Sequence, residues 1–378
     1  MKPWAVEAMN SRLFEKIYGW LIGASVGDAM GAAVENMHYL DIREQFGWVE
    51  GFLDYPPRYQ GGRPDYEVYS LFWHERREVQ RTEPHPWGAW RLEAGVYTDD
   101  MRWRILGIRS FLKRGRRVSG WDFARDALAY RIDCARFPEG DPQRVWSEGL
   151  FNLDELVQMC LKSPFGHTQI VGGVWGSPAG IIDAADPQRG AEDGGVIGAV
   201  VAEAMRPGAS VDSVIKTAFD YAAYLPDPER EPLPTWAGAF RTRLKRALED
   251  ADESGDVFEL IEKLYTWLCA TCPPFSIQNV FEALVAALAM VYKAEGDFRQ
   301  AVIGSVNFGR DCDTIACIAG EVLGALHGIS AVPKEWTETI ERQNPDPPLR
   351  RLAAEAAEAV QEKNRRERQI ADEVLGMS

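Results

Sequence analysis

Two stretches of this chain repeat glycine at every fourth position. The first carries Gly19, Gly23, Gly27 and Gly31, and the second carries Gly320, Gly324 and Gly328. The residues between them are apolar, and a four-residue spacing places the glycines on one face of a helix. Glycine inside a helix costs about 1 kcal/mol relative to alanine, so each helix needs a compensating contact. Because close packing of helix backbones supplies such a contact, we predict that both helices are buried and central.

Apolar residues elsewhere also recur at helical spacing, whereas alternating strand patterns are scarce. Examples are residues 106–112, residues 280–291 and the charged, amphipathic stretch 349–374. We therefore predict an all-α fold, organised as a single domain over residues 1–378. Irregular structure is predicted for 54–97, as a long loop or insertion, for 163–198 and for 225–235, and a helical extension is predicted for 337–378.

The composition excludes several classes of partner. The 378 residues carry a net charge of -15, which disfavours nucleic acid and anionic membranes because both attract basic surfaces. Six cysteines in a chain of this length do not indicate a disulfide framework. Residues 1–10 lack the pattern of a signal peptide, and the apolar stretch 17–34 contains Asp28 and several glycines. We predict a cytoplasmic protein with no membrane or nucleic-acid partner.

Two acidic motifs stand where helices are expected to begin. They are Thr98-Asp99-Asp100 and Asp311-Cys312-Asp313-Thr314. One acid or threonine at such a place is explained by helix capping, in which its oxygen accepts from free backbone N–H groups. Two acids and a threonine, twice, exceed what the caps need and bring like charges together, which raises their pKa values unless a cation neutralises them. Capping acids and a metal site both fit the pattern.

A metal site built from these motifs offers oxygen ligands only. Such a set favours Mg²⁺, Mn²⁺ or Ca²⁺ over Zn²⁺ or Cu²⁺. Six oxygen-bearing side chains suit two ions that share carboxylates about 3.5–4 Å apart. The donors alone do not choose among Mg²⁺, Mn²⁺ and Ca²⁺. The predicted ligands are Thr98, Asp99, Asp100, Asp311, Asp313 and Thr314.

Two further acids belong to the first glycine-spaced stretch. Asp28 interrupts an apolar face, and a buried carboxylate needs a cation, a hydrogen-bond donor or a basic partner. It either contributes to the site or caps a neighbouring helix. Glu35 follows the last of the four glycines. Glycosidic cleavage needs a carboxylate that activates water or protonates the leaving group, and Glu35 is the candidate.

Three blocks of residues resemble the ADP-ribosylglycohydrolase family, whose members remove ADP-ribose from arginine or serine. The blocks are residues 27–35, residues 97–100 and residues 307–314 with the helix that follows. The resemblance covers residues 17 to about 336. It implies an orthogonal helical domain with a binuclear Mg²⁺ cleft, in which the two acidic motifs supply the ligands. By the same resemblance, Glu35 would match the mobile acidic residue of the family, in which ribose hydroxyls bind at the metals and water attacks the anomeric carbon.

The chain departs from the family pattern at several positions. Met101 stands where Thr or Ser is common, and Arg310 and Cys312 replace smaller or hydroxylated residues. Members specific for ADP-ribose carry a glycine-asparagine-glycine motif that holds the phosphates. The nearest match here, residues 172–178, has no asparagine and contains Trp175.

These observations predict hydrolysis of a ribosyl N- or O-glycosidic bond, with an ADP-ribosylated protein or a ribosylated small molecule as substrate. The alternatives are a nucleoside or small-molecule glycosidase that does not use ADP-ribose, and a non-catalytic binder of ADP-ribose. The predicted catalytic residues are Glu35, Asp99 and Asp313. The predicted substrate contacts are Asp28, Tyr97, Gly173, Trp175, Gly176 and Ser177.

Overall fold

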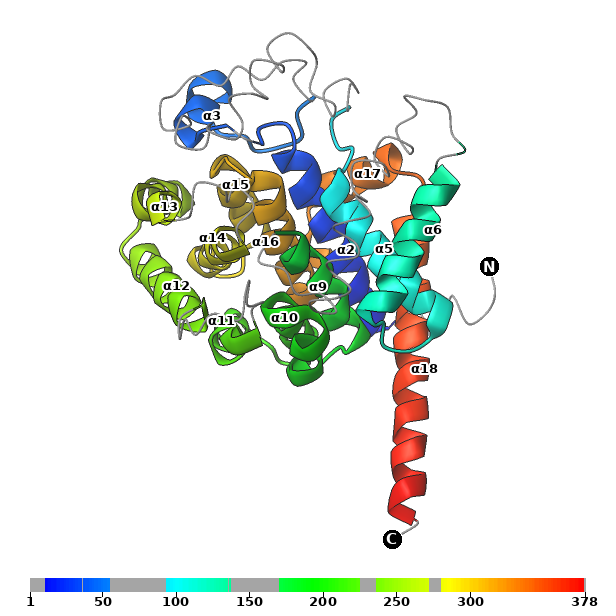
Figure 1. Ribbon diagram of the computed structural model, residues 1–378. Coiled ribbons are helices and arrows are strands. Elements are labelled where there is room, and N and C mark those ends of the chain that lie inside the picture. Colours follow the sequence, from blue (N-terminus) through cyan, green and yellow to red (C-terminus); the bar gives the residue numbers. More distant parts are fainter. Residues whose placement is uncertain are drawn as a thin grey trace.

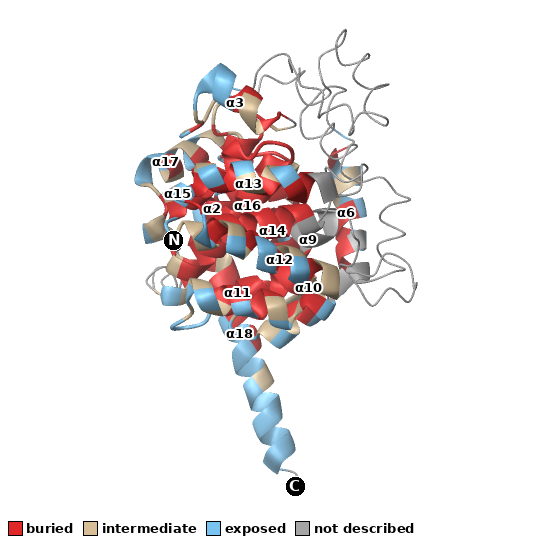
Figure 2. Cartoon of the chain, turned by 90° about the vertical axis from the view of Figure 1, so that its left-hand side faces the viewer, coloured by how far each residue is buried: buried red, intermediate tan, exposed pale blue. Residues whose placement is uncertain are grey.

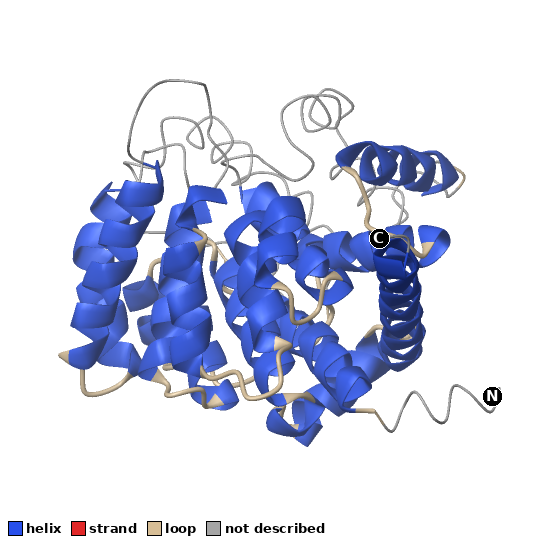
Figure 3. Ribbon diagram, turned by 90° about the horizontal axis from the view of Figure 1, so that it is seen from below, coloured by secondary structure: helices blue, strands red, loops and turns tan. Residues whose placement is uncertain are grey.

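A computed structural model describes residues 11–35, 37–54, 93–134, 136, 170–224, 236–271 and 280–376. Within these ranges the chain forms fourteen α-helices and no strand (Figure 3). The prediction of an all-α fold is therefore confirmed. Most of the predicted loop at 54–97 lies outside the described residues, and so does 225–235.

The helices follow one another along the whole chain. The first half contains α2 (Arg12–Gly31), α3 (Tyr39–Phe46), α5 (Asp99–Arg114), α6 (Gly120–Cys134), α9 (Ile170–Ile182), α10 (Pro187–Ala204) and α11 (Val211–Asp220). The second half contains α12 (Trp236–Asp252), α13 (Val257–Thr271), α14 (Val280–Lys293), α15 (Phe298–Asn307), α16 (Cys312–His327), α17 (Lys334–Gln343) and α18 (Leu349–Gly376). Short 3₁₀ turns lie at Ala222–Tyr224 and Ile329–Ala331.

The two glycine-spaced helices, α2 and α16, pack against each other in the centre of the molecule (Figure 1). A Cβ atom on Gly23 would lie 2.1 Å from the carbonyl oxygen of Gly320, and one on Gly19 would lie 2.4 Å from that of Gly324. The residue numbers rise along α2 as they fall along α16, so the helices are antiparallel. The predicted close packing of central helices is confirmed, and each helix proves to be the partner of the other.

Lys16 fixes the end of this pair at which α2 begins and α16 ends. Its buried ammonium donates to the carbonyl oxygens of Ala204, Ala325 and Leu326 at 2.6, 2.9 and 2.9 Å. These carbonyls belong to the last turns of α10 and α16, where carbonyl groups have no partner inside the helix and the helix dipole is negative. One lysine of α2 therefore ties two further helices to the central pair.

The other helices surround the central pair. In Figure 1, α5, α6 and α18 lie on one side, and α11 to α14 lie on the other. One hydrophobic cluster runs from Phe14 to Ala357 and draws residues from most of the described helices. The first half of α18 packs on α2, whereas residues 364–376 are almost wholly exposed and project from the body (Figure 2). The single domain over residues 1–378 remains a prediction.

The glycine-rich segment differs from its prediction. Irregular structure was expected for 163–198, but Ile170–Ile182 and most of Pro187–Ala204 are helical. The local preference of glycine and proline is overridden by packing, because α9 and α10 meet through their glycines. Among the described helices, none combines the length and the apolar character that crossing a membrane requires.

Candidate metal centre

The second acidic motif begins α16 at the place where α2 ends. A Cβ atom on Gly31 would lie 2.3 Å from the Cα atom of Asp313, so the glycine allows the two helix ends to touch. Asp311 is the N-cap residue of α16, yet its side chain makes no capping hydrogen bond. Instead, the Thr314 hydroxyl donates to Oδ1 of Asp311 at 3.2 Å. Capping therefore does not account for Asp311.

The first acidic motif begins α5, and Asp28 of α2 caps this helix from outside. The backbone N–H groups of Thr98 and Met101 donate to Oδ2 of Asp28 at 2.9 and 3.0 Å. The Thr98 side chain makes no capping bond of its own, and its hydroxyl donates to Asp28. A hydroxyl that donates its hydrogen keeps its oxygen lone pairs available. The capping interpretation thus holds for Asp28, while Thr98 retains the oxygen that a metal ligand needs.

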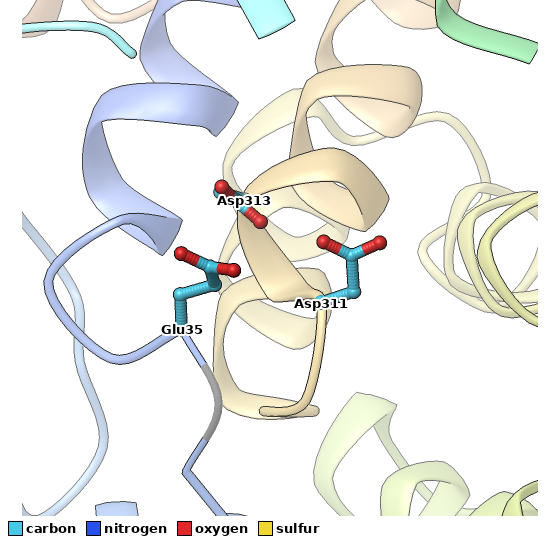
Figure 4. Close-up of side chains that lie close together, drawn as sticks. All are labelled: Glu35, Asp311 and Asp313. Atoms are coloured by element: carbon cyan, nitrogen blue, oxygen red, sulfur yellow. The ribbon is translucent and has the colours of Figure 1, made fainter. Parts of the chain in front are cut away.

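Three carboxylates gather where these elements meet. Ligand atoms of Glu35, Asp311 and Asp313 all lie within 4.8 Å of one another, an arrangement that could hold a metal ion (Figure 4). Glu35 comes from the turn after α2, and the two aspartates come from the start of α16. Residues from two segments far apart in the sequence therefore supply one cluster.

The acids of α5 belong to the same surroundings. Burial raises the pKa of Asp100, and the neighbouring charges of Asp99, Asp28 and Asp311 raise it further. Burial likewise raises the pKa of Asp313 well above its ordinary value, with further contributions from Glu35, Asp311 and Asp100. The charges of the two motifs therefore influence each other's pKa values, which places Asp100 near the start of α16. That both motifs hold the same metal ions stays a prediction, since the cluster within 4.8 Å contains Glu35, Asp311 and Asp313.

The chemistry of this donor set fits a hard divalent cation. Burial, followed by the charge of Asp99, raises the pKa of Asp311 to about 7. Oδ2 of Asp100 and Oδ2 of Asp311 are buried, and neither accepts a hydrogen bond from the described residues. A buried carboxylate oxygen without a donor is costly, and a cation relieves both that cost and the repulsion between the acids. Oxygen-only ligands suit Mg²⁺ or Mn²⁺.

Two loops next to the cluster are tied together. The backbone N–H of Arg310 donates to the carbonyl of Met37 at 2.8 Å, and His38 pairs with Gly309 in an isolated antiparallel bridge. The Arg310 side chain forms a buried, two-pronged ion pair with Glu282 of α14. This arrangement links the segment after Glu35 to the segment before Asp311.

The residues predicted to contact substrate lie in different parts of the structure. Tyr97 is buried, and its backbone N–H donates to Oδ1 of Asn344 at 3.2 Å. Gly176 packs against Gly194, and the Ser177 hydroxyl donates to a carboxylate oxygen of Glu321. Gly173 and Trp175 belong to the helix α9, and their predicted substrate contacts lie outside what the structure describes.

Sequence reasoning missed two buried charges beside the acids, Arg104 and Glu321. Nε of Arg104 donates to Oε2 of Glu321 at 2.8 Å, and both side chains are fully buried. A usable signal was present, because each is a charged residue among apolar neighbours: Arg104 between Trp103 and Ile105, and Glu321 after a glycine of the repeat. The same signal drew attention to Asp28.

The sequence of this chain is similar to those of a known enzyme family. This chain belongs to the ADP-ribosylglycohydrolase family, which matches residues 9–367. It is 24% identical over 339 residues to the uncharacterized protein YegU of Escherichia coli (strain K12), covering 84% of this chain and 89% of YegU.

Shorter matches connect the chain to two proteins named ADP-ribosylarginine hydrolase Tri1. The protein from Pseudomonas putida (strain GB-1) is 38% identical over 61 residues, 16% of each chain. The protein from Serratia proteamaculans (strain 568) is 34% identical over 64 residues, 17% of each chain. A solved structure titled ADP-ribosylglycohydrolase-related protein complex aligns with a TM-score of 0.46 and 17% identity, over 92% of this chain and 99% of that chain.

Proposed function

We propose that this protein is a metal-dependent glycosidase that hydrolyses a ribosyl N- or O-glycosidic bond, with an ADP-ribosyl group on a protein or small molecule as substrate. One observation carries the proposal. Distant segments bring buried acids together in a member of the ADP-ribosylglycohydrolase family, and Oδ2 of Asp100 and of Asp311 lack a donor among the described residues.

The proposed cofactor is a pair of Mg²⁺ ions, with Mn²⁺ as the alternative. Divalent cations at such a site supply positive charge and Lewis acidity next to the ribose. Two ions are proposed rather than one because the donors come from two motifs, each with two acids and a threonine. The residues that would hold them are Thr98, Asp99, Asp100, Asp311, Asp313 and Thr314.

Glu35 is the proposed proton acceptor. Its carboxylate lies within 4.8 Å of carboxylate oxygens of Asp311 and Asp313, and it comes from a turn rather than from the body of a helix. Glycosidic hydrolysis passes through an oxocarbenium-like transition state, and a positioned carboxylate assists it by taking a proton from the attacking water. Asp99 and Asp313 are the other acids that we propose as acceptors of that proton.

The test is release of the sugar from substrates of both classes. Purified protein is incubated with ADP-ribosylated arginine and serine peptides and with ribosylated small molecules, each with Mg²⁺, Mn²⁺ or excess EDTA. Mass spectrometry then measures free ADP-ribose and free ribose. We expect release that requires the metal and that Asp313→Asn abolishes, while the exposed control Asp372→Asn retains it. Full activity in EDTA contradicts the proposal.

A second candidate is a glycosidase for ribosyl compounds without the diphosphate. The described part of the segment 172–178 supports it, because Gly176 packs against Gly194 and Ser177 bonds to Glu321. A backbone used for helix packing is less available to cradle phosphates. Release of ribose from a nucleoside, with no release of ADP-ribose from either peptide, selects this candidate. Tight binding of ADP-ribose without cleavage of any substrate selects a non-catalytic binder instead.

A further inference from the structure

We infer that the buried Arg104–Glu321 ion pair is a positioning device for the metal-binding acids, which holds the start of α5 against the start of α16. The inference rests on the proposed metal site. Arg104 lies one turn beyond Asp100 on α5, and Glu321 lies about two turns beyond Asp313 on α16. The ion pair therefore joins the two helices one to two turns beyond the acids that they carry.

The Arg104 guanidinium contacts both helices at once. Nε and Nη2 donate to the two carboxylate oxygens of Glu321 at 2.8 and 3.1 Å. Nη1 donates to the backbone carbonyl of Asp100 at 2.9 Å and lies 4.0 Å from Oδ1 of the same residue. A planar guanidinium with its donors in a fixed fork fixes direction as well as distance. Arg104 thus fixes the position of the Asp100 backbone relative to α16.

Two more helices reach the same pair. The Ser177 hydroxyl of α9 donates to Oε2 of Glu321, and Nε1 of Trp20 on α2 donates to the Ser177 oxygen at 3.1 Å. All four side chains are fully buried. A buried polar network in which each described member has a partner specifies one arrangement of the helices that it connects. This network connects α2, α5, α9 and α16.

Stability alone does not explain why such a pair is present. Replacing a buried ion pair by apolar side chains of similar volume is often neutral or stabilising, because burying two charges is costly. Geometry does explain it. When they are ionised, Asp99, Asp100, Asp311, Asp313 and Glu35 repel one another and push the helix ends apart, and the ion pair opposes that movement. Groups that orient metal ligands in this way typically change metal affinity about 10- to 100-fold when they are removed.

The double variant Arg104→Met/Glu321→Leu separates the two roles. It removes both charges together, so neither is left buried without a partner. We expect a folded protein whose unfolding midpoint is close to that of the wild type, with Mg²⁺ binding weakened about 10- to 100-fold by calorimetry with Mg²⁺ alone. The matched control is Lys363→Met/Asp183→Leu, a buried pair with a 2.9 Å contact between α18 and the end of α9. We expect this control to bind Mg²⁺ as the wild type does.

Two single variants keep the test decisive if the double variant does not fold. Arg104→Lys keeps the charge but loses the fork, and Ser177→Ala removes one bond to Glu321 while leaving the ion pair. Both should weaken Mg²⁺ binding, Arg104→Lys more strongly. If Ser177 contacts substrate instead, Ser177→Ala raises the KM and leaves the Mg²⁺ Kd unchanged.

The inference and the proposed function fail in different ways. Wild-type Mg²⁺ affinity in a folded Arg104→Met/Glu321→Leu variant, or in Arg104→Lys where the double variant is unfolded, overturns the positioning role and leaves the metal site intact. A wild-type protein that binds neither Mg²⁺ nor Mn²⁺ overturns the proposed function itself.

Discussion

Two pairs of helices in this protein meet through glycine, α2 with α16 and α9 with α10. In the first pair Gly23 faces Gly320, and in the second pair Gly176 faces Gly194. In each case a Cβ atom would lie within about 2.1 Å of a carbonyl oxygen on the other helix, so the backbones are in direct contact. The same packing device is therefore used twice.

The two pairs of helices differ in the residues that lie at their ends. The α2·α16 pair ends with Gly31 against Asp313, beside Glu35 and Asp311. The α9·α10 pair is bent, because Gly195 has non-helical backbone angles and Gly190 packs against Gly198 of the same element. Close packing is thus a means of joining helices, and the acids at one end make only the first pair a candidate site.

The largest effect is expected for Gly23→Ala in the first pair. The added Cβ would meet the Gly320 carbonyl oxygen at 2.1 Å, and backbone cannot move aside as a flexible side chain can. We expect a loss of about 3 kcal/mol in the free energy of unfolding, measured in urea, because overpacking of this kind is costly. Mg²⁺ binding should weaken as well, since α16 carries the acids. Wild-type stability would show that the helices are not held this closely.

Mg²⁺ itself should stabilise the protein through the first pair. At a concentration 100 times its Kd, a ligand that binds only the folded state adds about 2.7 kcal/mol to the free energy of unfolding. Asp313→Asn should remove this gain and, without metal, should be at least as stable as the wild type because one buried charge is gone. Unfolding followed with and without Mg²⁺ measures both effects. A full Mg²⁺ gain in Asp313→Asn contradicts the assignment.

A smaller loss of about 2 kcal/mol is expected for Gly190→Ala within α10, the bent helix of the second pair. Its Cβ would lie 2.5 Å from the carbonyl oxygen of Gly198, but α10 is already bent at Gly195 and can adjust there. Because this element carries none of the acids, the Mg²⁺ Kd should stay at the wild-type value. A variant that loses stability and Mg²⁺ affinity together would mean that the two pairs are not separate in function.

A pH effect should distinguish the pairs further. Burial raises the pKa of Asp311 to about 7 in the folded protein. At a pH between the ordinary pKa of an aspartate and this raised value, folding is therefore coupled to the uptake of a proton. The metal-free protein should therefore lose stability as the pH rises from about 4 to about 7, the window between the ordinary pKa and the raised one. Mg²⁺ should bind about tenfold more tightly at pH 8 than at pH 6, because it competes with that proton. Asp311→Asn should reduce the loss of stability without abolishing it, because Asp100 and Asp313 also have raised pKa values. Gly190→Ala should keep both trends.

The smallest effect, with the opposite sign, is expected for a glycine outside both pairs. Gly238 lies in α12 with nothing within 4 Å of its missing Cβ. Gly238→Ala should raise the free energy of unfolding by about 0.5–1 kcal/mol, since alanine is the better helix former. A loss on the scale of Gly23→Ala would show that helical glycine is needed here for reasons other than close packing.

The two pairs also show what the sequence can and cannot predict. The spacing of Gly19, Gly23, Gly27 and Gly31 predicts helix packing because the residues between them are apolar. The same spacing occurs at Gly172, Gly176 and Gly180 and at Gly190, Gly194 and Gly198. There, Pro178 inside the helix and the additional glycines at 173 and 195 hide it, so the segment was predicted to be irregular.

For the candidate site, residue types were easier to predict than partners. The two acidic motifs identified the oxygen donors because acids in apolar, helical surroundings need a cation or a cap. Which acid caps and which does not depends on the distance between α2 and α5, and no local pattern encodes that distance. The Asp28 cap and the Arg104–Glu321 pair are contacts between segments remote in sequence, so they became visible only in the folded chain.

The pairing of α2 with α16 has a consequence for how the protein is made. Gly31 and Cys312, which are in contact, are 281 positions apart. At about 5–20 residues per second, a ribosome needs roughly 15 to 60 seconds to synthesise the stretch between them. Throughout that interval the glycine face of α2 has no α16 to pack against, so it is accessible to other segments of the chain and to chaperones. The proposed metal site combines residues from the turn after α2 and from the starts of α5 and α16, so it cannot form before α16 has been synthesised.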